Sequence, residues 1–308
     1  MIYIKGTTDI EIAEDTALSI GKFDGLHEGH EFLLEALFQK KQQIGLKTAI
    51  FTFDMPPVKG LGKADCKVLT TNVERKNLFE ELGIDYLVEC PFVPEISTME
   101  PEFFIRMLVD RLHVKFLVAG EDCSFGYQRK GNAQTLLDFS EKYGYEAQIV
   151  KKKKKAGRDI SSTYVREEVA AGRMENAREL LGYPYFVSGK VMHGKALGRT
   201  IGIPTINLMP GEEKLLPPFG VYAACAVFGE EKYTGIANVG IKPTVGKENR
   251  AGVEMHIFDF TENLYDKEVK IELLHFIRAE RRFDSIEELK LQIQKDCETV
   301  RKMQPFHS

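Results

Sequence analysis

Two histidines, His27 and His30, lie three residues apart in the glycine-rich segment GKFDGLHEGH, residues 21–30. The apolar run before this segment predicts a strand, and the apolar stripe that follows it at helical spacing predicts a helix. Both imidazoles then face the same way beside the free N–H groups of a helix N-terminus, which attract phosphate. Gly21 and Gly29 let the backbone approach a ligand closely. The pattern predicts two histidines that stabilise negative charge at phosphorus during group transfer, rather than two surface histidines in a loop.

The segment DISSTYVR, residues 159–166, is a second pattern of this kind. Ser161 or Ser162 is suited to cap a helix that begins at Thr163. Arg166 falls within the first turns of that helix, where its guanidinium can bind phosphate. Taken alone, the segment also fits a helix cap without chemistry. Its prediction as a second phosphate site therefore depends on the histidine pair.

The second half of the chain contains another glycine-rich segment, GKVMHGKALGRTIGIPTIN, residues 189–207. Backbone N–H groups of such a segment can wrap a polyphosphate, although the spacing is not that of a Walker A motif. The hydroxyl of Thr205 and the amide oxygen of Asn207 are hard oxygen ligands of the kind that Mg²⁺ prefers. We therefore predict that Thr205 and Asn207 hold Mg²⁺ and that this segment, with its glycines and lysines around His193, wraps the phosphates of a nucleotide.

Glu254 stands within the strand-forming segment VEMHIFDF. A carboxylate on an otherwise apolar strand needs a reason. One reason is general-base catalysis, in which the carboxylate takes the proton of a primary hydroxyl that attacks the γ-phosphate of ATP. Alternation along the strand also fits a side chain that simply faces solvent.

The order of the expected elements divides the chain in two. Strands alternate with helices in the first half, which predicts a parallel sheet covered on both faces, with ligands at the carboxyl ends of the strands. Five strands follow one another in the second half and predict a small antiparallel barrel. A terminal helix is expected to begin with a capping box at Ser285 and Glu288. Because Gly182 to Pro184 interrupt the pattern, we predict domains at 1–182 and 183–308.

Composition excludes several classes of protein. The net charge of −4 gives no electrostatic case for a nucleic-acid binder. Five scattered cysteines without C-x-x-C spacing argue against a zinc site or a disulfide framework and for a reducing compartment. No signal-peptide core or long apolar span is visible, so we expect a cytoplasmic protein without membrane contact. No obligate protein partner is expected.

Five consecutive lysines, Lys151 to Lys155, precede the DISSTYVR segment. A solvated loop or hairpin is the favoured interpretation. An electrostatic funnel for ATP and a contact with RNA are the alternatives, and the net charge weakens the second of these.

The first half resembles the nucleotidyltransferase half of bacterial bifunctional riboflavin kinase/FAD synthetases. The family pattern G-x-F-D-G-x-H-x-G-H is met at residues 21–30, and S-S-T-x-x-R at residues 161–166. GEDCSFGYQRKG at 120–131 and LTTNVERK at 69–76 resemble two further family segments. The resemblance implies a Rossmann-like HxGH nucleotidyltransferase domain with His27, His30 and Arg166 as catalytic residues. It assigns ATP binding to Gly21, Phe23, Asp24, Gly29, Asp122, Ser161, Ser162 and Thr163.

The second half is similar to the riboflavin kinase module of the same family. Gly189, His193 and Gly194 match its nucleotide loop, PTIN at 204–207 matches P-T-A-N, and Glu254 matches its catalytic glutamate. NVGIKPT at 238–244 matches N-V-G-x-x-P-T, and NLYD at 263–266 resembles D-L-Y-G. The resemblance further implies that the flavin is bound by Asn238, Gly240 and Arg278. It assigns ATP binding in this half to Gly189, Lys190, His193, Gly194, Gly198, Thr205 and Asn207.

Taken together, the two resemblances imply an enzyme that phosphorylates riboflavin to FMN and adenylylates FMN to FAD, with ATP as co-substrate and Mg²⁺ as cofactor. The sequence departs from the family at Cys123, where an aromatic residue is usual, and at FDMPP, residues 53–57, in place of P-H-P. Three alternatives stay open. The first domain could activate another phosphate compound with CTP or ATP, which the second domain argues against. The chain could be a riboflavin kinase with a degenerate or repurposed first domain, or, less favoured, a flavin-sensing regulator that binds RNA.

Overall fold

The computed structural model describes residues 1–54, 67–192, 202–243 and 249–303. The chain divides into two compact units, Met1–Ser162 and Thr163–Ser308. The boundary predicted at residues 182 and 183 lies within the second unit, after two short helices, and stays a prediction. Each unit is described below by itself.

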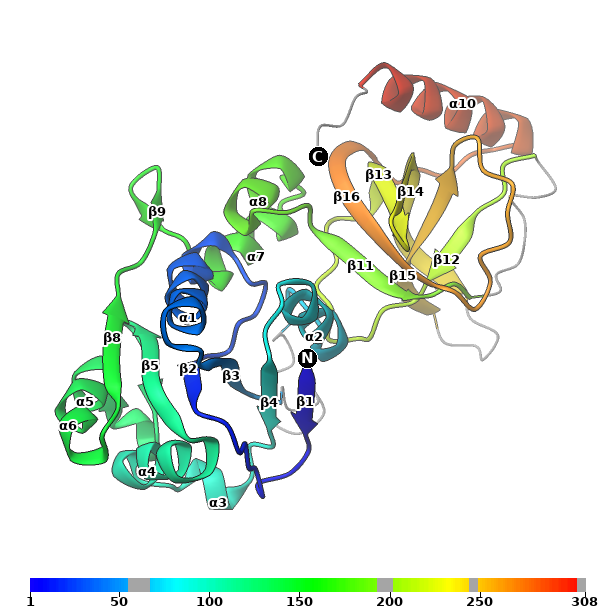
Figure 1. Cartoon of the computed structure of the whole chain (residues 1–308). Helices are drawn as coiled ribbons and strands as arrows, with labels where there is room; N and C mark the ends of the chain where they lie inside the picture. Colours follow the sequence, from blue (N-terminus) through cyan, green and yellow to red (C-terminus); the bar gives the residue numbers. More distant parts are fainter. Residues whose placement is uncertain (55–66, 193–201, 244–248, 304–308) are drawn as a thin grey trace. The chain divides into compact units, whose positions relative to one another are not determined.

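A six-stranded sheet in the order β1-β4-β3-β2-β5-β8 forms the centre of the first unit, and every neighbouring pair is parallel (Figure 1). Its strands are β1 (Ile2–Lys5), β2 (Thr16–Ile20), β3 (Lys47–Phe53), β4 (Tyr86–Cys90), β5 (Val114–Gly120) and β8 (Glu146–Val150). The other elements are η1 (Glu28–His30), α1 (Glu31–Ile44), α2 (Asn72–Glu81), α3 (Pro94–Ser97), α4 (Pro101–Leu112), β6 (Ser124–Phe125), η2 (Tyr127–Arg129), β7 (Gly131–Asn132), α5 (Ala133–Asp138), α6 (Ser140–Tyr143), β9 (Lys154–Lys155) and β10 (Arg158–Asp159).

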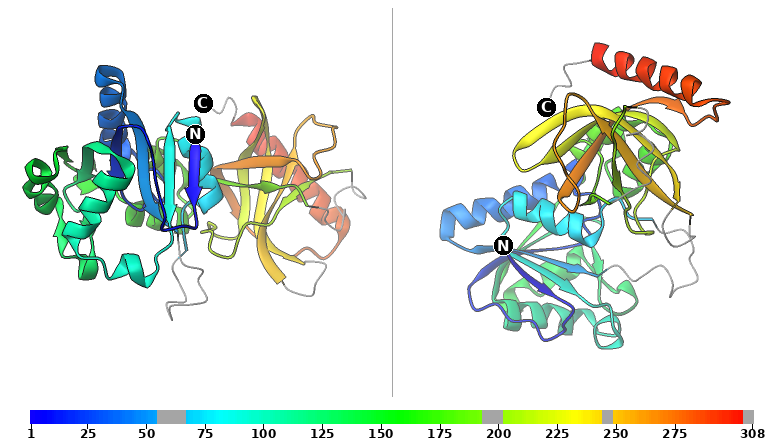
Figure 2. Two further views of the ribbon diagram at one scale, coloured as in Figure 1. Left: turned by 60° about the horizontal axis from the view of Figure 1, so that its bottom comes forward. Right: turned by 90° about the vertical axis from the view of Figure 1, so that its right-hand side faces the viewer.

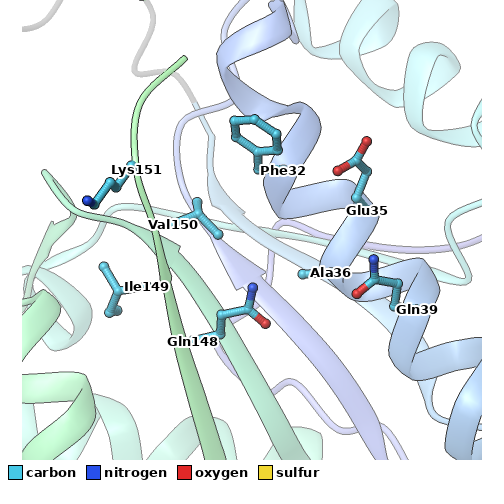
Figure 3. Close-up of a pocket in the computed structure, with 8 residues that line it drawn as sticks. All are labelled: Phe32, Glu35, Ala36, Gln39, Gln148, Ile149, Val150 and Lys151. Carbon is cyan, nitrogen blue, oxygen red and sulfur yellow. The ribbon is translucent and has the colours of Figure 1, made fainter.

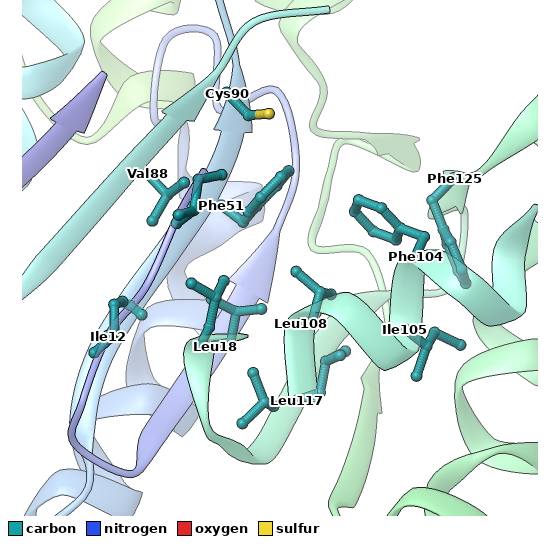
Figure 4. Packing of buried hydrophobic residues seen from close by; sticks show 14 of the residues in the cluster. Ile12, Leu18, Phe51, Val88, Cys90, Phe104, Ile105, Leu108, Leu117 and Phe125 are labelled. Carbon is teal, nitrogen blue, oxygen red and sulfur yellow. The ribbon is translucent and has the colours of Figure 1, made fainter. Parts of the chain in front are cut away.

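Consecutive strand residues point to opposite faces of this sheet, and each face is covered by its own helices. On one face Leu18, Phe51 and Leu117 pack with Phe104 and Leu108 of α4 (Figure 4). Their chain neighbours face the other way, toward a second cluster formed with α1 and α2. That cluster includes Ala17, Ile50, Phe116, Leu33, Leu37 and Phe79. The predicted α/β fold with a parallel sheet is confirmed.

A second six-stranded sheet, in the order β11-β16-β13-β14-β15-β12 and antiparallel throughout, forms the second unit. The two outermost strands of this order also meet: Met192, just after β11, forms an antiparallel bridge with Asn207 of β12. This bridge nearly closes the sheet into a barrel. Its strands are β11 (Phe186–Lys190), β12 (Ile206–Leu208), β13 (Gly220–Phe228), β14 (Glu231–Pro243), β15 (Asn249–Ile257) and β16 (Glu268–Ala279). Its helices are α7 (Ser162–Ala170), which begins at the unit boundary, α8 (Met174–Leu181) and α10 (Ile286–Lys302). Figure 2 shows the barrel strands and α10 from two further sides.

The terminal helix α10 lies against the outer face of the barrel. Val300 packs there with Val221, Ala223 and Leu274. Its start differs in part from the predicted capping box: Ser285 Oγ accepts from the Glu288 N–H, but the Glu288 carboxylate accepts from the N–H of Asp284 at 3.3 Å. The predicted barrel with a terminal helix is confirmed.

Candidate phosphate-transfer sites

The two histidines of the first unit lie face to face. A 3-10 turn, η1, precedes α1, and the His30 N–H donates to the His27 carbonyl at 2.8 Å across it. Because such a turn has about three residues per repeat, residues three apart come close together. The imidazole rings stack with centroids 3.9 Å apart and planes 20° apart. The buried ring of Phe23 packs on His30 at 5.0 Å, so the side chain of Phe23 supports the pair from inside.

Burial lowers the pKa of His30 well below its usual value, and the neighbouring His27 lowers it further. Its Nδ1 is buried and has no hydrogen-bond partner among the residues that the structure describes. Without a ligand the His30 imidazole is therefore neutral near pH 7. An anion held against the pair would supply the missing opposite charge and favour the protonated form.

Asp24 fastens the glycine-rich segment to the rest of the unit. Its Oδ1 accepts from the backbone N–H groups of Leu69 at 2.9 Å and Thr70 at 3.0 Å, and the Thr70 hydroxyl accepts from the Gly25 N–H at 3.1 Å. The Ser162 hydroxyl donates to the Asp24 carbonyl at 2.8 Å. The predicted ATP-binding residue Asp24 thus holds the loop with its buried side chain and joins it to the start of α7.

Gly29 is required by close packing. A Cβ at this position would lie 2.8 Å from His27 Nδ1 and 2.9 Å from the Ile160 carbonyl oxygen. The segment that leads into α7 therefore passes directly against the histidine turn. Thr163 and Arg166 continue α7 into the second unit.

A fully buried ion pair, which the sequence analysis did not predict, supports the same loop. Arg75 Nη2 lies 2.9 Å from Glu89 Oε2, and neither side chain is exposed. Arg75 Nη1 donates to the Lys22 carbonyl at 2.9 Å, inside the glycine-rich segment. The signal was present, because Glu89 is a carboxylate on the apolar strand YLVEC, as Glu254 is on its own strand. Arg75 lies within the family-like segment at 69–76.

Two further predicted residues of the first site, Gly21 and Asp122, lie at the surface, whereas Ser161 and Arg166 are partly buried. Gly21 follows β2 directly and is exposed. Asp122 lies in the turn after β5, and its carboxylate, 64% exposed, pairs with Lys152 at 2.9 Å. Of the two departures from the family, Cys123 is partly buried against the core, and burial raises its pKa to about 11, so it stays a thiol. Met55 and Pro56 lie outside the described residues.

In the second unit, strand register gathers the predicted polar residues. Glu254 on β15 pairs with Asn207 on one side and Asn238 on the other. Side chains that are directly opposite in an antiparallel pair share one face of the sheet. The Thr205 hydroxyl donates to Glu254 Oε1 at 2.6 Å. A hydroxyl, two amides and a carboxylate therefore meet on the outer face of the barrel.

The residues assigned to flavin binding lie around this group. Gly240 lies beside the exposed carboxylate of Glu280, whose Oε1 accepts from Asn238 Nδ2 at 3.1 Å. Arg278 occupies the same cross-sheet row as Asn238, with Val221 between them. Its guanidinium is bound to Asp296 of α10, with Nη2 at 2.8 Å from Oδ2, so it fastens the helix to the barrel.

The predicted ATP loop is described only in part. Gly189 and Lys190 end β11, beside Val269 and Glu268 of β16. His193, Gly194 and Gly198 lie outside the described residues. A cavity of about 270 Å³ opens beside Thr205 and is lined also by Phe260, Asn263 and Tyr265. The sequence analysis matched 263–266 to a family segment without giving it a role.

A second cavity, of about 330 Å³, lies between α1 and β8 (Figure 3). Phe32, Glu35 and Gln39 face Gln148 and Lys151 across it. None of the predicted site residues lines it.

The described residues offer neither an acidic or thiol-rich metal cluster nor a membrane-spanning helix. No cluster of three or more histidine, cysteine, aspartate or glutamate side chains there could hold a metal ion. No helix among them combines the length and the apolar character needed to cross a membrane. The Mg²⁺ prediction instead rests on the hydroxyl and amide oxygens beside Glu254, which are hard ligands and fit that ion.

Two family models match the chain in succession. The FAD synthetase model matches residues 9–164, and the riboflavin kinase model matches residues 181–304. The chain is 34% identical over 297 residues to a bifunctional riboflavin kinase/FMN adenylyltransferase of Listeria monocytogenes, covering 96% of this chain and 94% of that protein. It is 37% identical to the enzyme of that description from Bacillus subtilis, covering 91% of this chain and 90% of that protein. It is 36% identical to the one from Escherichia coli K12, covering 98% of this chain and 97% of that protein.

A solved structure also matches nearly the whole chain. It is a Streptococcus pneumoniae crystal structure described as a macrolide-efflux protein, with a TM-score of 0.84 and 30% identity. The match covers 97% of this chain and 98% of that chain.

The lowered pKa of His30 predicts a pH-dependent stability. Below about pH 6.5 the unfolded chain takes up a proton on His30, whereas the folded chain does not until the pH reaches the lowered folded pKa. The free energy of unfolding is therefore at its full value above about pH 6.5 and decreases as the pH falls through this window. We expect His30→Asn to reduce the dependence of the unfolding free energy on pH by up to about 1.4 kcal/mol per pH unit. Urea unfolding of ligand-free protein at pH 7.5 and 5.5, followed by circular dichroism, measures it. Equal slopes in both proteins would contradict the neutral, buried imidazole.

The buried Arg75–Glu89 pair predicts a large and local effect. Arg75→Met leaves an uncompensated buried carboxylate and should destabilise the first unit by about 3–5 kcal/mol, whereas Arg75→Met/Glu89→Met should recover part of the loss. Thiol labelling in increasing urea, read by mass spectrometry, separates the units: buried Cys90 reports the first, and buried Cys225 reports the second as an internal control. A double variant no more stable than Arg75→Met would show that the pair is not the cause.

Proposed function

The chain belongs to the family of bifunctional riboflavin kinase/FMN adenylyltransferases, and from that premise we propose which of its residues carry each reaction. It phosphorylates riboflavin with ATP to give FMN, and it adenylylates FMN with ATP to give FAD and pyrophosphate. Both family models are matched, one on each half of the chain, so neither a kinase alone nor a regulator is the favoured function.

For the kinase, Glu254 is the general base. The observation that carries this assignment is the 2.6 Å hydrogen bond from the Thr205 hydroxyl to the Glu254 carboxylate. Asn207 and Asn238 lie directly opposite Glu254 on the two neighbouring strands, so their side chains share its face of the sheet. The 5′-hydroxyl of riboflavin loses its proton to Glu254 as its oxygen bonds to the γ-phosphorus, and the bond from that phosphorus to the β-phosphate oxygen breaks to release ADP.

Thr205 and Asn207 would hold Mg²⁺, which supplies charge neutralisation at the phosphates when bound. The cavity beside Thr205 offers room for part of the nucleotide next to that position. Gly189, Lys190, His193, Gly194 and Gly198 bind ATP in the same proposal. The flavin is bound beside Asn238, Gly240 and Arg278 in this proposal. Arg278 contributes through its ion pair with Asp296, which holds α10 against the barrel.

For adenylyl transfer, an FMN phosphate oxygen attacks the α-phosphorus of ATP, and the bond to the β-phosphate oxygen breaks to release pyrophosphate. His27 and His30 stabilise the added negative charge, and Arg166 assists them. No covalent enzyme intermediate is needed. We assign the triphosphate to the backbone of Gly21–Gly29, to Ser161–Thr163 and to the neighbourhood of Asp122, while the side chains of Phe23 and Asp24 hold the loop.

The setting of these reactions is part of the proposal. The free thiols of Cys90, Cys123, Cys225 and Cys297 agree with a reducing compartment, and we place the enzyme in the cytoplasm. Its partners are riboflavin, FMN, FAD and ATP, without nucleic acid, membrane or obligate protein partner.

Loss of the base should silence one reaction only. Glu254→Gln keeps the size of the side chain but removes its basicity, and we expect the riboflavin kinase kcat to fall about 10²–10⁴-fold. FMN adenylylation in the same preparation is the matched control and should be unchanged. Kinase activity within a few-fold of wild type would remove Glu254 from the role of base.

The reverse pattern is expected for the histidine pair. His27→Ala and His30→Ala should each lower the kcat of FMN adenylylation about 10²–10³-fold, because each removes one donor from the charged transition state. Riboflavin kinase activity should persist. His113→Asn, in an exposed histidine of the same unit, serves as the control. Undiminished FAD formation in the combined variant His27→Ala/His30→Ala would contradict this assignment.

A further inference from the structure

Two members of the lysine run are paired with acidic side chains from elsewhere in the first unit. The run leaves β8 and enters the predicted hairpin, β9 and β10, which pair antiparallel. Lys152 Nζ lies 2.9 Å from Asp122 Oδ2. Lys153 Nζ lies 2.9 Å from Glu28 Oε2 and 2.7 Å from Glu31 Oε2. The run thus leads into the predicted hairpin, and two of its lysines, which stay partly exposed, also pair with carboxylates that are distant in the sequence.

The two carboxylates that Lys153 binds stand on either side of His30 in the chain. Glu28 lies within η1, and Glu31 is the first residue of α1, so the two enclose His30 in the chain. Both hydrogen bonds raise the pKa of Lys153 well above its usual value, so it is fully charged at neutral pH. Without that charge, two carboxylates would stand unneutralised beside a turn that has to accept a polyphosphate.

The backbone of Lys153 is tied to the second phosphate motif. Its carbonyl accepts from the Ile160 N–H at 2.9 Å, and the Ile160 carbonyl passes against Gly29. Ser161 and Ser162 follow directly. Lys153 therefore connects the histidine turn through its side chain and the segment entering α7 through its main chain.

We propose that Lys153 is a positioning residue for adenylyl transfer, which holds the histidine turn through Glu28 and Glu31 and neutralises them beside the incoming triphosphate. The inference rests on the proposed role of His27 and His30. The ion pairs are a third to a half exposed, so they add little to stability. Catalysis is more sensitive, since a displacement of about 1 Å at reacting groups can cost about 10²-fold in rate.

Steady-state kinetics of FMN adenylylation test this proposal. Lys153→Met should lower kcat about tenfold with little change in the KM for ATP, and Lys153→Arg should restore most of the activity. Lys154→Met is the matched control, because the Lys154 side chain is 65% exposed and its ion pair with Asp159 is long, at 3.7 Å. Riboflavin kinase activity of each preparation reports enzyme concentration, and urea-dependent labelling of the buried Cys90 thiol reports folding of the first unit. Wild-type kcat in Lys153→Met overturns the proposal.

A second background separates positioning from direct contact with ATP. In Glu28→Gln/Glu31→Gln, the partners of Lys153 are gone, and adding Lys153→Met should cause no further loss of kcat. An equal loss in both backgrounds, or a rise confined to the KM for ATP, would mean that Lys153 binds the nucleotide itself, and the proposal would be wrong. Failure of the histidine assignment is recognised separately, by intact FAD formation in His27→Ala/His30→Ala.

Discussion

The buried carboxylate of Asp24 is the contact on which the first site depends. A glycine-rich loop pays a large entropic cost when it is ordered, and here that cost is met by a few specific contacts. Asp24 binds two backbone N–H groups of the segment before α2, and its carbonyl binds Ser162. The contact of Arg75 with Lys22 and the packing of Gly29 against Ile160 add to these and fix the loop that carries the two stacked imidazoles. In the proposed mechanism, the residues of the motif thus divide into those that face a ligand and those that hold the loop.

The second unit reaches a comparable arrangement by sheet register. Asn207, Glu254 and Asn238 come from three adjacent strands, and direct pairing puts their side chains on one face. A slip of one residue in any of these strands would turn that strand's polar side chain to the other face, so the pairing that stabilises the barrel also keeps the three residues together. The Arg278–Asp296 and Arg301–Asp259 pairs hold α10 beside this face.

Local patterns in the sequence were enough to predict much of this. Alternating strands and helices predicted the parallel sheet, and the spacing of His27 and His30 predicted their shared orientation. The strand β1 was missed because four residues, IYIK, carry too little pattern. Lys153 could not be assigned from the sequence because its partner Glu31 is 122 residues away, and only the fold brings them together. Arg75 and Glu89 share this difficulty, although a carboxylate on an apolar strand was a usable signal. The capping box was half right, since a neighbouring N–H competed for Glu288.

The central claim is that one chain carries two chemically separate sites. Its most direct test is chromatography of the products that purified wild-type protein forms with ATP and Mg²⁺, first from riboflavin and then, in a separate reaction, from FMN. We expect FMN followed by FAD in the first reaction and FAD in the second. FMN as the final product of the first reaction, with FMN untouched in the second, would contradict it and leave a kinase whose histidine turn has another use.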